Sequence, residues 1–369
     1  MITRIRIQNF KAFKEAEINL TNLNLFTGMN GMGKSTFIQS LLLLRQSDAN
    51  FIPELKGLQL KGNLIDIGKG KDAHCIHADT NTISFEIDED YKEIVNVTYN
   101  FIAESDILPF NVKSERNLIS AGNYSLFNNN FKYLKAERIA PEHIYKANLA
   151  AVQQSGFLGY QGENVPLFIA LNKFEPIKLD SVKLNDAHNL ISNIDAWLKE
   201  ITPGTHIIST YYNDLDIVKL GYQFENGKDV TPEFSPVNVG FGFTYILPVI
   251  TAILSAKRGD LIIIENPESH LHPQGQAKLG ELIAKAANDG VQLIIESHSD
   301  HLFNGIRVAI KNGYVKTDDV STFYFLRNDP SVEHITMIEQ PVIESNGRIS
   351  HKPPGFFDEY AKQLDELIK

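Results

Sequence analysis

The apolar and polar positions of the N-terminal region predict two strands followed by a helix. Isoleucines alternate with polar and charged residues over positions 2–7, and a second apolar run, 23–26, leads directly into Gly28. Alternation with a period of two, and short apolar runs that end in a turn, are typical of strands. From Lys34 onward the apolar positions recur at helical spacing, so we expect a buried helix there.

The middle of the chain changes its pattern twice. Between about residues 82 and 133, short β-prone segments are separated by clusters of Asn, Gly and Asp, which predicts an antiparallel β-subdomain. Residues 142–200 then show the longer spacing of helices, before β-prone runs return at 206–212 and 217–222. We interpret this part as an inserted helical arm.

In the C-terminal half, helical and strand patterns alternate in the order of βαβ units. The predicted order is helix 244–254, strand 261–264, helix 274–287 and strand 292–295. Such an order implies a parallel sheet, because consecutive parallel strands need a crossover connection. The predicted fold class is therefore α/β, with a central mostly parallel sheet, an antiparallel β-subdomain and an inserted helical arm.

The composition is that of an ordinary globular protein, with 369 residues, 43% hydrophobic and 22% charged. The patterns above predict one core, residues 1–330, that an insertion splits. The expected boundaries are 1–80 and 236–330 for the core parts, about 81–140 for the β-subdomain, about 141–235 for the helical and β insertion, and 331–369 for a small C-terminal segment.

The turn after the second strand carries a phosphate-binding signature. Residues 28–35 fit G-x-x-x-x-G-K-[ST] without a mismatch, between an apolar strand and an apolar helix as the motif requires. Glycines let backbone N–H groups curl around phosphate oxygens, the lysine reaches the β- and γ-phosphates, and the hydroxyl coordinates Mg²⁺. The candidate nucleotide-binding residues here are Asn30, Gly31, Gly33, Lys34, Ser35 and Thr36.

A second candidate site follows the predicted strand 261–264. Glu265 ends this strand, and strand C-termini are where α/β sheets hold ligands, so we assign Glu265 to the Mg²⁺ side of the nucleotide, directly or through water. His298 follows another apolar strand, and we assign it to sensing the γ-phosphate.

A third segment, residues 238–244, places two glycines before an apolar helix. Asn238, Gly240 and Gly242 would present N–H groups to a phosphate across an interface. Two glycines before a helix are also typical of close packing, so this assignment depends on the other motifs.

Taken in order, these segments resemble the SMC/RecF/OLD-like ABC-type ATPases of prokaryotes. The segments that carry the resemblance are residues 7–13, the phosphate loop, 239–242, 264–273 and 296–299. The resemblance covers the ends of the predicted core and leaves its middle unassigned. Within that group the chain looks like the small stand-alone AAA/ABC ATPases that end in a short domain of unknown function, here residues 349–368.

The resemblance implies a P-loop NTPase fold of the ABC/SMC-head type that binds and hydrolyses ATP with Mg²⁺. It also implies a head-to-tail homodimer or higher oligomer, in which the loop of one subunit and segment 238–244 of another enclose ATP. Several such ATPases belong to antiphage defence systems and act with a nuclease or other effector protein encoded nearby. After Ser299 the clustered carboxylates of a two-metal nuclease are missing, so we expect no nuclease activity in this chain.

Asn266 departs from the family pattern. The family often has a catalytic glutamate after the metal-side carboxylate, and an amide cannot accept the proton of the attacking water. Either Glu268 takes this role, or hydrolysis is slow and the chain works as an ATP-dependent clamp or sensor. We favour slow but real hydrolysis. The alternative function is a nucleotide-dependent DNA sensor or clamp for DNA repair with little intrinsic hydrolysis.

The histidines around the acidic strand favour a competing chemistry, a transition-metal hydrolase. Its ligands would be His270, His272, His298, Asp300 and His301. We rank it below the ATPase, because His272 and Pro273 occupy the place where the resemblance puts the dimer contact.

The charge balance limits the partners. With 35 Lys and Arg against 45 Asp and Glu, the net charge is −10, so DNA would need a local basic patch. Two clusters are candidates, although acidic neighbours weaken both and a solvated face is the commoner outcome. The clusters are Lys132, Tyr133, Lys135, Arg138, Tyr145 and Lys146, and separately Lys56, Lys61, Lys69 and Lys71.

Several features predict a cytoplasmic protein with no membrane contact. Cys75 is the single cysteine and cannot form an internal disulfide, and residues 1–10 lack a basic stretch followed by an apolar run. No apolar run approaches the roughly 20 residues needed to cross a bilayer. A transporter ATPase ranks last, because the predicted insertion is SMC/RecF-like and offers no surface for coupling to membrane subunits.

Overall fold

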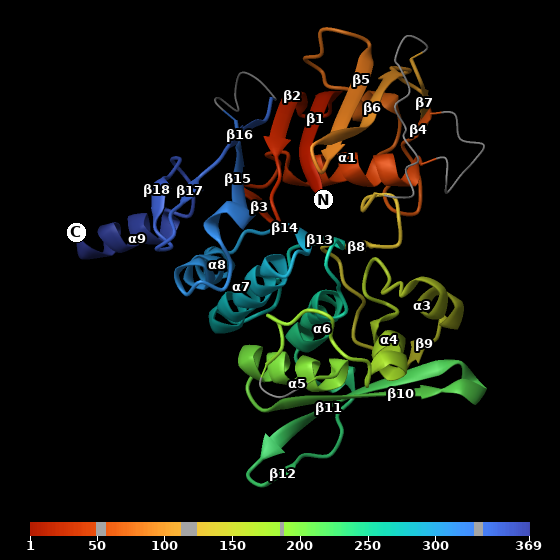
Figure 1. Ribbon diagram of the computed structural model, residues 1–369, viewed down its shortest axis with the longest axis vertical. Helices are drawn as coiled ribbons and strands as arrows, with labels where there is room; N and C mark the ends of the chain where they lie inside the picture. The colour runs from red at the N-terminus through yellow and green to blue at the C-terminus, as the bar shows by residue number, and fades with distance from the viewer. Residues whose placement is uncertain (49–56, 112–123, 185–187, 328–334) are drawn as a thin grey trace. The chain divides into compact units, whose positions relative to one another are not determined.

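Contacts between residues divide the chain into two units, which are described in turn. Unit 1 contains Met1–Phe131, Val320–Glu344 and Ile349–Lys369, and unit 2 contains Lys132–Asp319 and Ser345–Arg348. The computed structural model, drawn in Figure 1, describes residues 1–48, 57–111, 124–184, 188–327 and 335–369.

In unit 1, the N-terminal strands pair with the β-prone segments that follow residue 82. All neighbours in this sheet are antiparallel, in the order β2(Phe13–Asn19), β1(Ile2–Phe10), β5(Thr82–Glu89) and β6(Lys92–Asn100). Alternate residues such as Ile5, Ile7 and Phe85 are buried, while Arg4 pairs with Asp88 on the other face. The alternation along the sequence therefore decides which face of the sheet packs on the core.

The second part of unit 1 holds the strand and helix on either side of the phosphate loop. β3(Leu23–Gly28) pairs in parallel with β15(Val320–Leu326), which pairs antiparallel with β16(Met337–Glu339). α1(Lys34–Gln46) follows the loop, and the ring of Phe37 meets that of Phe26 edge to face at 5.0 Å between centroids. This aromatic contact fixes the helix against the strand that precedes it.

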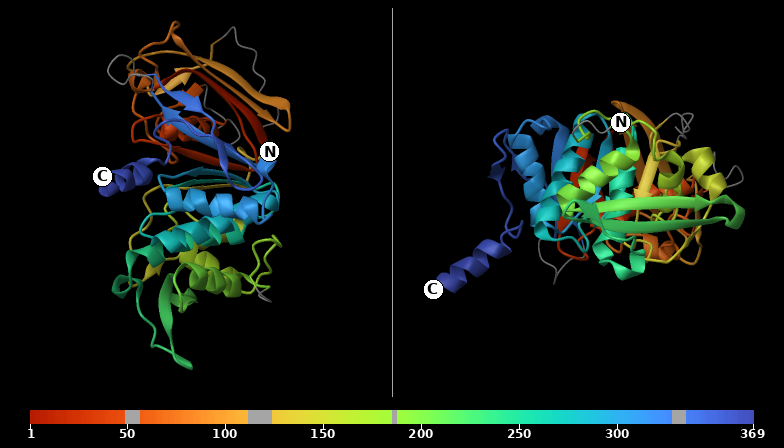
Figure 2. Two further views of the ribbon diagram at one scale, coloured as in Figure 1. Left: turned by 90° about the vertical axis from the view of Figure 1, so that its left-hand side faces the viewer. Right: turned by 90° about the horizontal axis from the view of Figure 1, so that it is seen from below.

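The remaining elements of unit 1 are short. They are β4(Gly57–Gln59) paired with β7(Ile107–Pro109), α2(Gly70–Ala73), β17(Val342–Ile343) paired with β18(Ile349–His351), and α9(Glu359–Ile368). Figure 2 shows α9 extending away from β17 and β18, and its Tyr360, Leu367 and Ile368 are exposed. β8(Phe131–Leu134) lies at the boundary of the two units.

Unit 2 contains the predicted βαβ order. β13(Leu261–Glu265) pairs in parallel with β14(Gln292–Glu296), and α7(Pro273–Asn288) connects them. α7 packs closely on α8(Asp300–Lys311), because Gly305 has no side chain: a Cβ there would lie 2.1 Å from the carbonyl oxygen of Ala277. α6(Phe241–Leu254) is buried over most of its length.

The rest of unit 2 combines short helices with a β-ribbon. The elements are β9(Tyr145–Lys146), α3(Leu149–Ser155), α4(Val165–Asn172), α5(Leu190–Ile201), β10(Thr205–Tyr212), β11(Ile217–Asn226) and β12(Asp229–Val230). β10 and β11 form an antiparallel hairpin. Trp197 of α5 is buried and donates its indole N–H to the carbonyl of Val182 at 2.7 Å.

The predicted α/β fold class is confirmed, with parallel pairs in both units and a separate antiparallel sheet. One helix begins earlier than predicted: α6 starts at Phe241 instead of residue 244, with Gly240 as its N-cap. Gly242 therefore lies inside the first turn, where a Cβ would be 2.7 Å from the carbonyl oxygen of His270. Close packing explains this glycine. None of the described helices is long and apolar enough to cross a membrane.

Candidate functional site

The phosphate loop connects β3 to α1 in unit 1. Gly28, Gly31 and Gly33 have φ of 139°, 77° and 101°, values that side chains with a Cβ rarely adopt. Gly28 and Gly33 are also crowded, since a Cβ would lie 2.3 Å from the carbonyl oxygen of Phe325 or 2.6 Å from Thr336 Oγ1. Each glycine of the signature is thus required by the backbone that is present.

The polar side chains of the loop lie at and just before the start of α1. Lys34 is buried at the start of α1, and its Nζ donates to the carbonyl oxygens of Gly28 and Met29 at 3.0 and 2.9 Å. Ser35 is exposed in the first turn, Thr36 is half-buried, and Asn30 is exposed. The loop therefore offers backbone N–H groups, an ammonium group and a hydroxyl at one helix N-terminus.

Two residues that the sequence analysis missed hold this loop from the C-terminal part of unit 1. Arg327 Nη2 donates to the carbonyl oxygen of Gly31 at 2.6 Å, and Thr336 Oγ1 donates to that of Met32 at 2.9 Å. The amide of Thr336 donates in turn to the carbonyl of Ala12 at 2.9 Å. No sequence signal announces these contacts, because they join residues at opposite ends of the chain.

In unit 2, Glu265 ends β13, and both oxygens of its carboxylate accept hydrogen bonds. Its Oε1 accepts from the hydroxyl of Tyr133 at 2.8 Å and its Oε2 from the amide of Ala136 at 3.3 Å. Burial, and then the charge of Glu265, raise the pKa of Tyr133, so this hydroxyl stays a donor. Each carboxylate oxygen can accept more than one bond, so the group still fits a magnesium ion or a water bound to it.

The turn after Glu265 brings Glu268 and His298 together. Glu268 Oε1 accepts from the backbone amide of His298 at 2.9 Å, while the His298 side chain is exposed. Burial raises the pKa of Glu268, because the charged carboxylate loses contact with water. Asn266 has a φ of 45°, and its amide donates to the carbonyl of Glu296 at 2.8 Å. Asparagine tolerates this conformation better than most residues.

Arg138 contacts the end of β13 next to this turn, although the sequence predicted it only as part of a basic cluster for DNA. Its Nη2 donates to the carbonyl oxygen of Glu265 at 2.9 Å, and burial lowers its pKa to about 10 although Glu265 and other acidic groups raise it. Among the described residues, Nε and Nη1 of Arg138, Oδ1 of Asn266 and Oε2 of Glu268 find no hydrogen-bond partner although they are buried. Such groups are costly unless a ligand or water pairs with them.

Several residues of the first basic cluster proposed for DNA are engaged within unit 2, which weakens that hypothesis. Lys132 Nζ donates to Ser255 Oγ at 3.2 Å and lies 3.5 Å from Asp260, and burial lowers its pKa to about 8. Tyr133 and Arg138 support Glu265, as described above. Lys132 and Arg138 thus support a strand and a turn, while Lys135 is half-buried and Lys146 is exposed.

The second basic cluster is neutralised in part. Lys69 and Lys71 lie 2.6 and 3.1 Å from the carboxylate of Glu104, and Lys56 lies outside the described residues. Exposed pairs of this kind add little stability, but they remove positive charge from the surface.

The histidines of the competing metal-site hypothesis have other contacts. His272 Nδ1 accepts from the amide of Gln274 at 3.4 Å as the N-cap of α7, and the ring of His270 meets that of Tyr245 at 4.6 Å. Within the part of the chain that the structure describes, no three His, Cys, Asp or Glu side chains gather to hold a metal. The structure therefore gives the transition-metal hypothesis no support.

The segment with Asn238, Gly240 and Gly242 begins α6 on the surface of unit 2. Asn238 and Gly240 are exposed, a Cβ at Gly240 would meet nothing within 4 Å, and Phe241 beside it is 55% exposed. Gly240 is thus open to another molecule, whereas the backbone N–H of Asn238 already donates to the carbonyl oxygen of Ser235 at 2.9 Å, and Gly242 is explained by packing.

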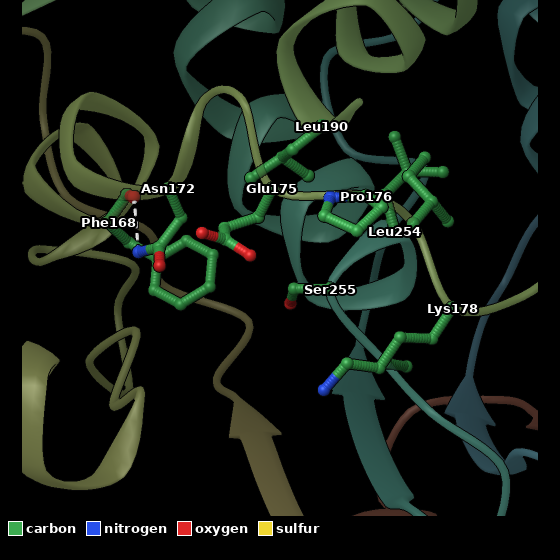
Figure 3. A pocket seen from close by; sticks show the side chains of 10 residues that line it. Phe168, Asn172, Glu175, Pro176, Lys178, Leu190, Leu254 and Ser255 are labelled. Atoms are coloured by element: carbon green, nitrogen blue, oxygen red, sulfur yellow. Dashed lines mark hydrogen bonds between the residues drawn. The ribbon is translucent and has the colours of Figure 1, made fainter. Parts of the chain in front are cut away.

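A pocket of about 220 Å³ lies elsewhere in unit 2, at the C-terminal end of α6. Figure 3 shows Glu175 and Lys178 reaching it from opposite sides, with Ser255 between them. None of the predicted nucleotide or catalytic residues lines this pocket.

Comparisons with known proteins agree with these features. Residues 23–304 match a family described as "AAA domain, putative AbiEii toxin, Type IV TA system". Residues 315–367 match a family described as "Protein of unknown function (DUF3696)". No curated protein matches the chain.

Solved structures show the same fold at low sequence identity. The chain is similar to the SmcHead bound to the C-winged helix domain of ScpA, with a TM-score of 0.53 at 13% identity over 92% of this chain and 97% of that one. It is also similar to an Smc head domain with an extended coiled coil bound to the C-terminal domain of ScpA, derived from Pyrococcus furiosus. That match has a TM-score of 0.51 at 13% identity, over 100% of this chain and 99% of that one.

Proposed function

From the premise that the chain belongs to the AAA domain family described as putative AbiEii toxin, Type IV TA system, we propose that it hydrolyses ATP with Mg²⁺ as a homodimer. The family and the SMC-head fold support a nucleotide-binding ATPase of the SMC/RecF/OLD-like ABC type. The observation that carries the proposal is the phosphate loop, with its left-handed glycines, the buried Lys34 and the exposed Ser35 at the start of α1.

The donor set fits magnesium. Ser35 offers a hydroxyl and Glu265 a carboxylate, which are the oxygen ligands that Mg²⁺ prefers, together with phosphate oxygens. We assign Ser35 to the ion from the sequence motif and Glu265 from its place at the end of β13, each directly or through water; a bound ion would neutralise charge on the phosphates. Tyr133 and the amide of Ala136 orient the Glu265 carboxylate for this task.

We assign the acceptance of the water proton to Glu268, and not to the amide of Asn266. A buried carboxylate with a raised pKa is a better base than an exposed one, because it binds the proton more strongly. Asn266 would orient the water through its amide, and His298, whose backbone amide binds Glu268, would sense the γ-phosphate. The proposed rate is slow, since the base approaches from an unusual position in the turn.

We further propose that ATP is enclosed between subunits, by the loop of one and by Asn238 and Gly240 of another. The exposure of these two residues supports the assignment. A similar SmcHead was solved bound to a domain of ScpA, and we propose that this chain too binds a partner. The partner would be a protein, such as a nuclease encoded nearby, or DNA, and the nucleotide state of this chain would be coupled to it. Antiphage defence in the cytoplasm is the proposed setting.

A second candidate function is an ATP-dependent DNA sensor or clamp with little intrinsic hydrolysis. Asn266 favours it, because the residue in the family's catalytic position cannot accept a proton. In that case Lys34 and the loop would still bind ATP. The function would then depend on closure of the dimer around the nucleotide, and not on hydrolysis.

Phosphate release by the purified chain tests the proposal, with and without Mg²⁺ and beside nucleotide binding. Lys34→Ala should abolish release, and the exposed Lys362→Ala, which removes an equal charge from α9, should not. Binding without release in the wild type would favour the clamp. If the wild type binds no ATP, or if Lys34→Ala releases phosphate normally, the proposed site is wrong.

A further inference from the structure

The C-terminal region contacts the phosphate loop at three successive places. This region, residues 315–367, matches a family of unknown function, and it supplies β15 and β16. Phe325 lies opposite Gly28 in the β3–β15 register, Arg327 binds the carbonyl of Gly31, and Thr336 binds that of Met32. The region is therefore part of the environment of the loop.

Each of the two side-chain contacts determines the direction of a peptide group. A peptide is planar, and in a trans peptide the C=O of one residue and the N–H of the next point in opposite directions. The described residues contain no cis peptide. Holding the carbonyl of Gly31 therefore aims the N–H of Met32 the other way, and holding the carbonyl of Met32 does the same for the N–H of Gly33.

Those N–H groups are the part of the motif that binds phosphate. In a loop of this signature, backbone N–H groups cradle the α- and β-phosphates. A loop whose N–H groups already point toward the ligand loses less conformational freedom on binding, which favours affinity. Arg327 and Thr336 act on the outer side of the same peptide groups.

Thr336 is well fixed for this role. It is buried, and its own amide donates to the carbonyl of Ala12, so its hydroxyl is held at one place. The backbone of Gly33 passes so close that a Cβ would lie 2.6 Å from Thr336 Oγ1. The phosphate loop and the Thr336 side chain are therefore packed so closely that neither can move far without the other.

We propose that the C-terminal region pre-organises the phosphate loop, with Arg327 and Thr336 as positioning residues that aim the N–H groups of Met32 and Gly33 at the phosphates of a nucleoside di- or triphosphate. This inference rests on the proposed function. It gives the region of unknown function a task in nucleotide binding, and it predicts an effect that depends on the phosphates of the ligand.

Affinities for ATP, ADP and adenosine, measured by competition with a fluorescent ATP analogue, test the inference. Thr336→Val keeps the size of the side chain but removes the donor, so ATP and ADP should bind about fivefold more weakly, the loss of one neutral hydrogen bond. Arg327→Gln removes a charged donor, and we expect a loss of about tenfold. Thr336→Ser keeps the hydroxyl and should bind like the wild type.

Thr322→Val is the matched control. Thr322 is also buried in unit 1, on β15, and its hydroxyl forms no hydrogen bond within the described residues, so this variant should bind all three ligands normally. Adenosine, which has no phosphate, should bind equally to all variants. Thermal unfolding checks that each variant is folded.

The outcomes separate this inference from the proposed function. Normal ATP affinity in Thr336→Val and Arg327→Gln would overturn the inference while leaving the ATPase proposal intact, provided that Lys34→Ala still fails to bind. If Thr322→Val lost as much ATP affinity as Thr336→Val, or if the variants lost as much affinity for adenosine as for ATP, the cause would be general destabilisation. Either result would also overturn the inference. A wild type that binds no nucleotide would overturn both.

Discussion

Glu268→Gln is the sharpest test of the proposed chemistry. The amide has the size of the carboxyl group, and its oxygen can still accept the hydrogen bond from the backbone amide of His298, which is 2.9 Å long in the structure. The change removes the negative charge and the ability to accept a proton, while the turn around Asn266 can stay as it is.

The expected loss of turnover follows from the role assigned to the carboxylate. A positioned general base contributes about 10²- to 10⁴-fold to a rate, which corresponds to roughly 3–5 kcal/mol of barrier. ATP affinity should change little, because Glu268 has no assigned contact with the ground-state nucleotide.

Although Glu268→Gln should lower turnover, it should raise the stability of the fold. Burial raises the pKa of Glu268 in the folded protein, so its ionisation destabilises the fold, and this cost grows as the pH rises from the unfolded pKa through the folded one. Glutamine does not ionise. Glu268→Gln should therefore unfold at a higher temperature than the wild type near neutral pH; the difference should shrink as the pH falls through the raised folded pKa and be absent below the ordinary value of about 4.5.

Single-turnover phosphate release and thermal unfolding at both pH values measure these effects. The exposed Glu366→Gln on α9 is the control, with normal turnover and unfolding expected. Turnover within about twofold of the wild type in Glu268→Gln would refute the assignment of the base, since even a weak general base contributes more. A lower unfolding temperature at neutral pH would refute the account of its burial.

Three further predictions concern unit 2. Arg138→Met should lower turnover without abolishing ATP binding, because the carbonyl of Glu265 loses its donor, and Arg138→Lys should restore part of it; steady-state kinetics measure both. Lys132→Ala should destabilise the fold by about 3–5 kcal/mol, since it leaves a buried carboxylate at Asp260 without its cation, whereas a DNA-binding residue would show unchanged unfolding in denaturant. Gly242→Ala should cost about 1–3 kcal/mol in the same assay, because a Cβ would press on a carbonyl oxygen 2.7 Å away.

Local patterns predicted the loop, the main strands and the fold class. The phosphate signature is contiguous, so its glycines, Lys34 and Ser35 could be named from their spacing alone, and the structure shows why each glycine is needed. The resemblance to SMC/RecF/OLD-like ATPases is confirmed by the family match and the similar fold.

Contacts between distant residues could not be predicted. Arg327 and Thr336 reach the loop across most of the chain, and no periodicity or motif marks them. Clustering of charges misled in the same way: Lys132 and Arg138 look like a basic surface in the sequence, but burial depends on which strand and turn they meet. The start of α6 was placed too late, because a glycine inside a first turn looks like a loop until its packing is known.

The central claim is that ATP is hydrolysed in a site shared by two copies of the chain. Lys34→Ala disables the loop, and Gly240→Trp disables the opposing segment, where the structure has open space at Gly240. Each variant alone should release no phosphate. In a symmetric dimer with two such sites, an equal mixture forms hybrids that keep one intact site, so about a quarter of wild-type activity should return. A mixture that stays inactive, although both variants are folded and exchange subunits with the wild type, would contradict the shared site.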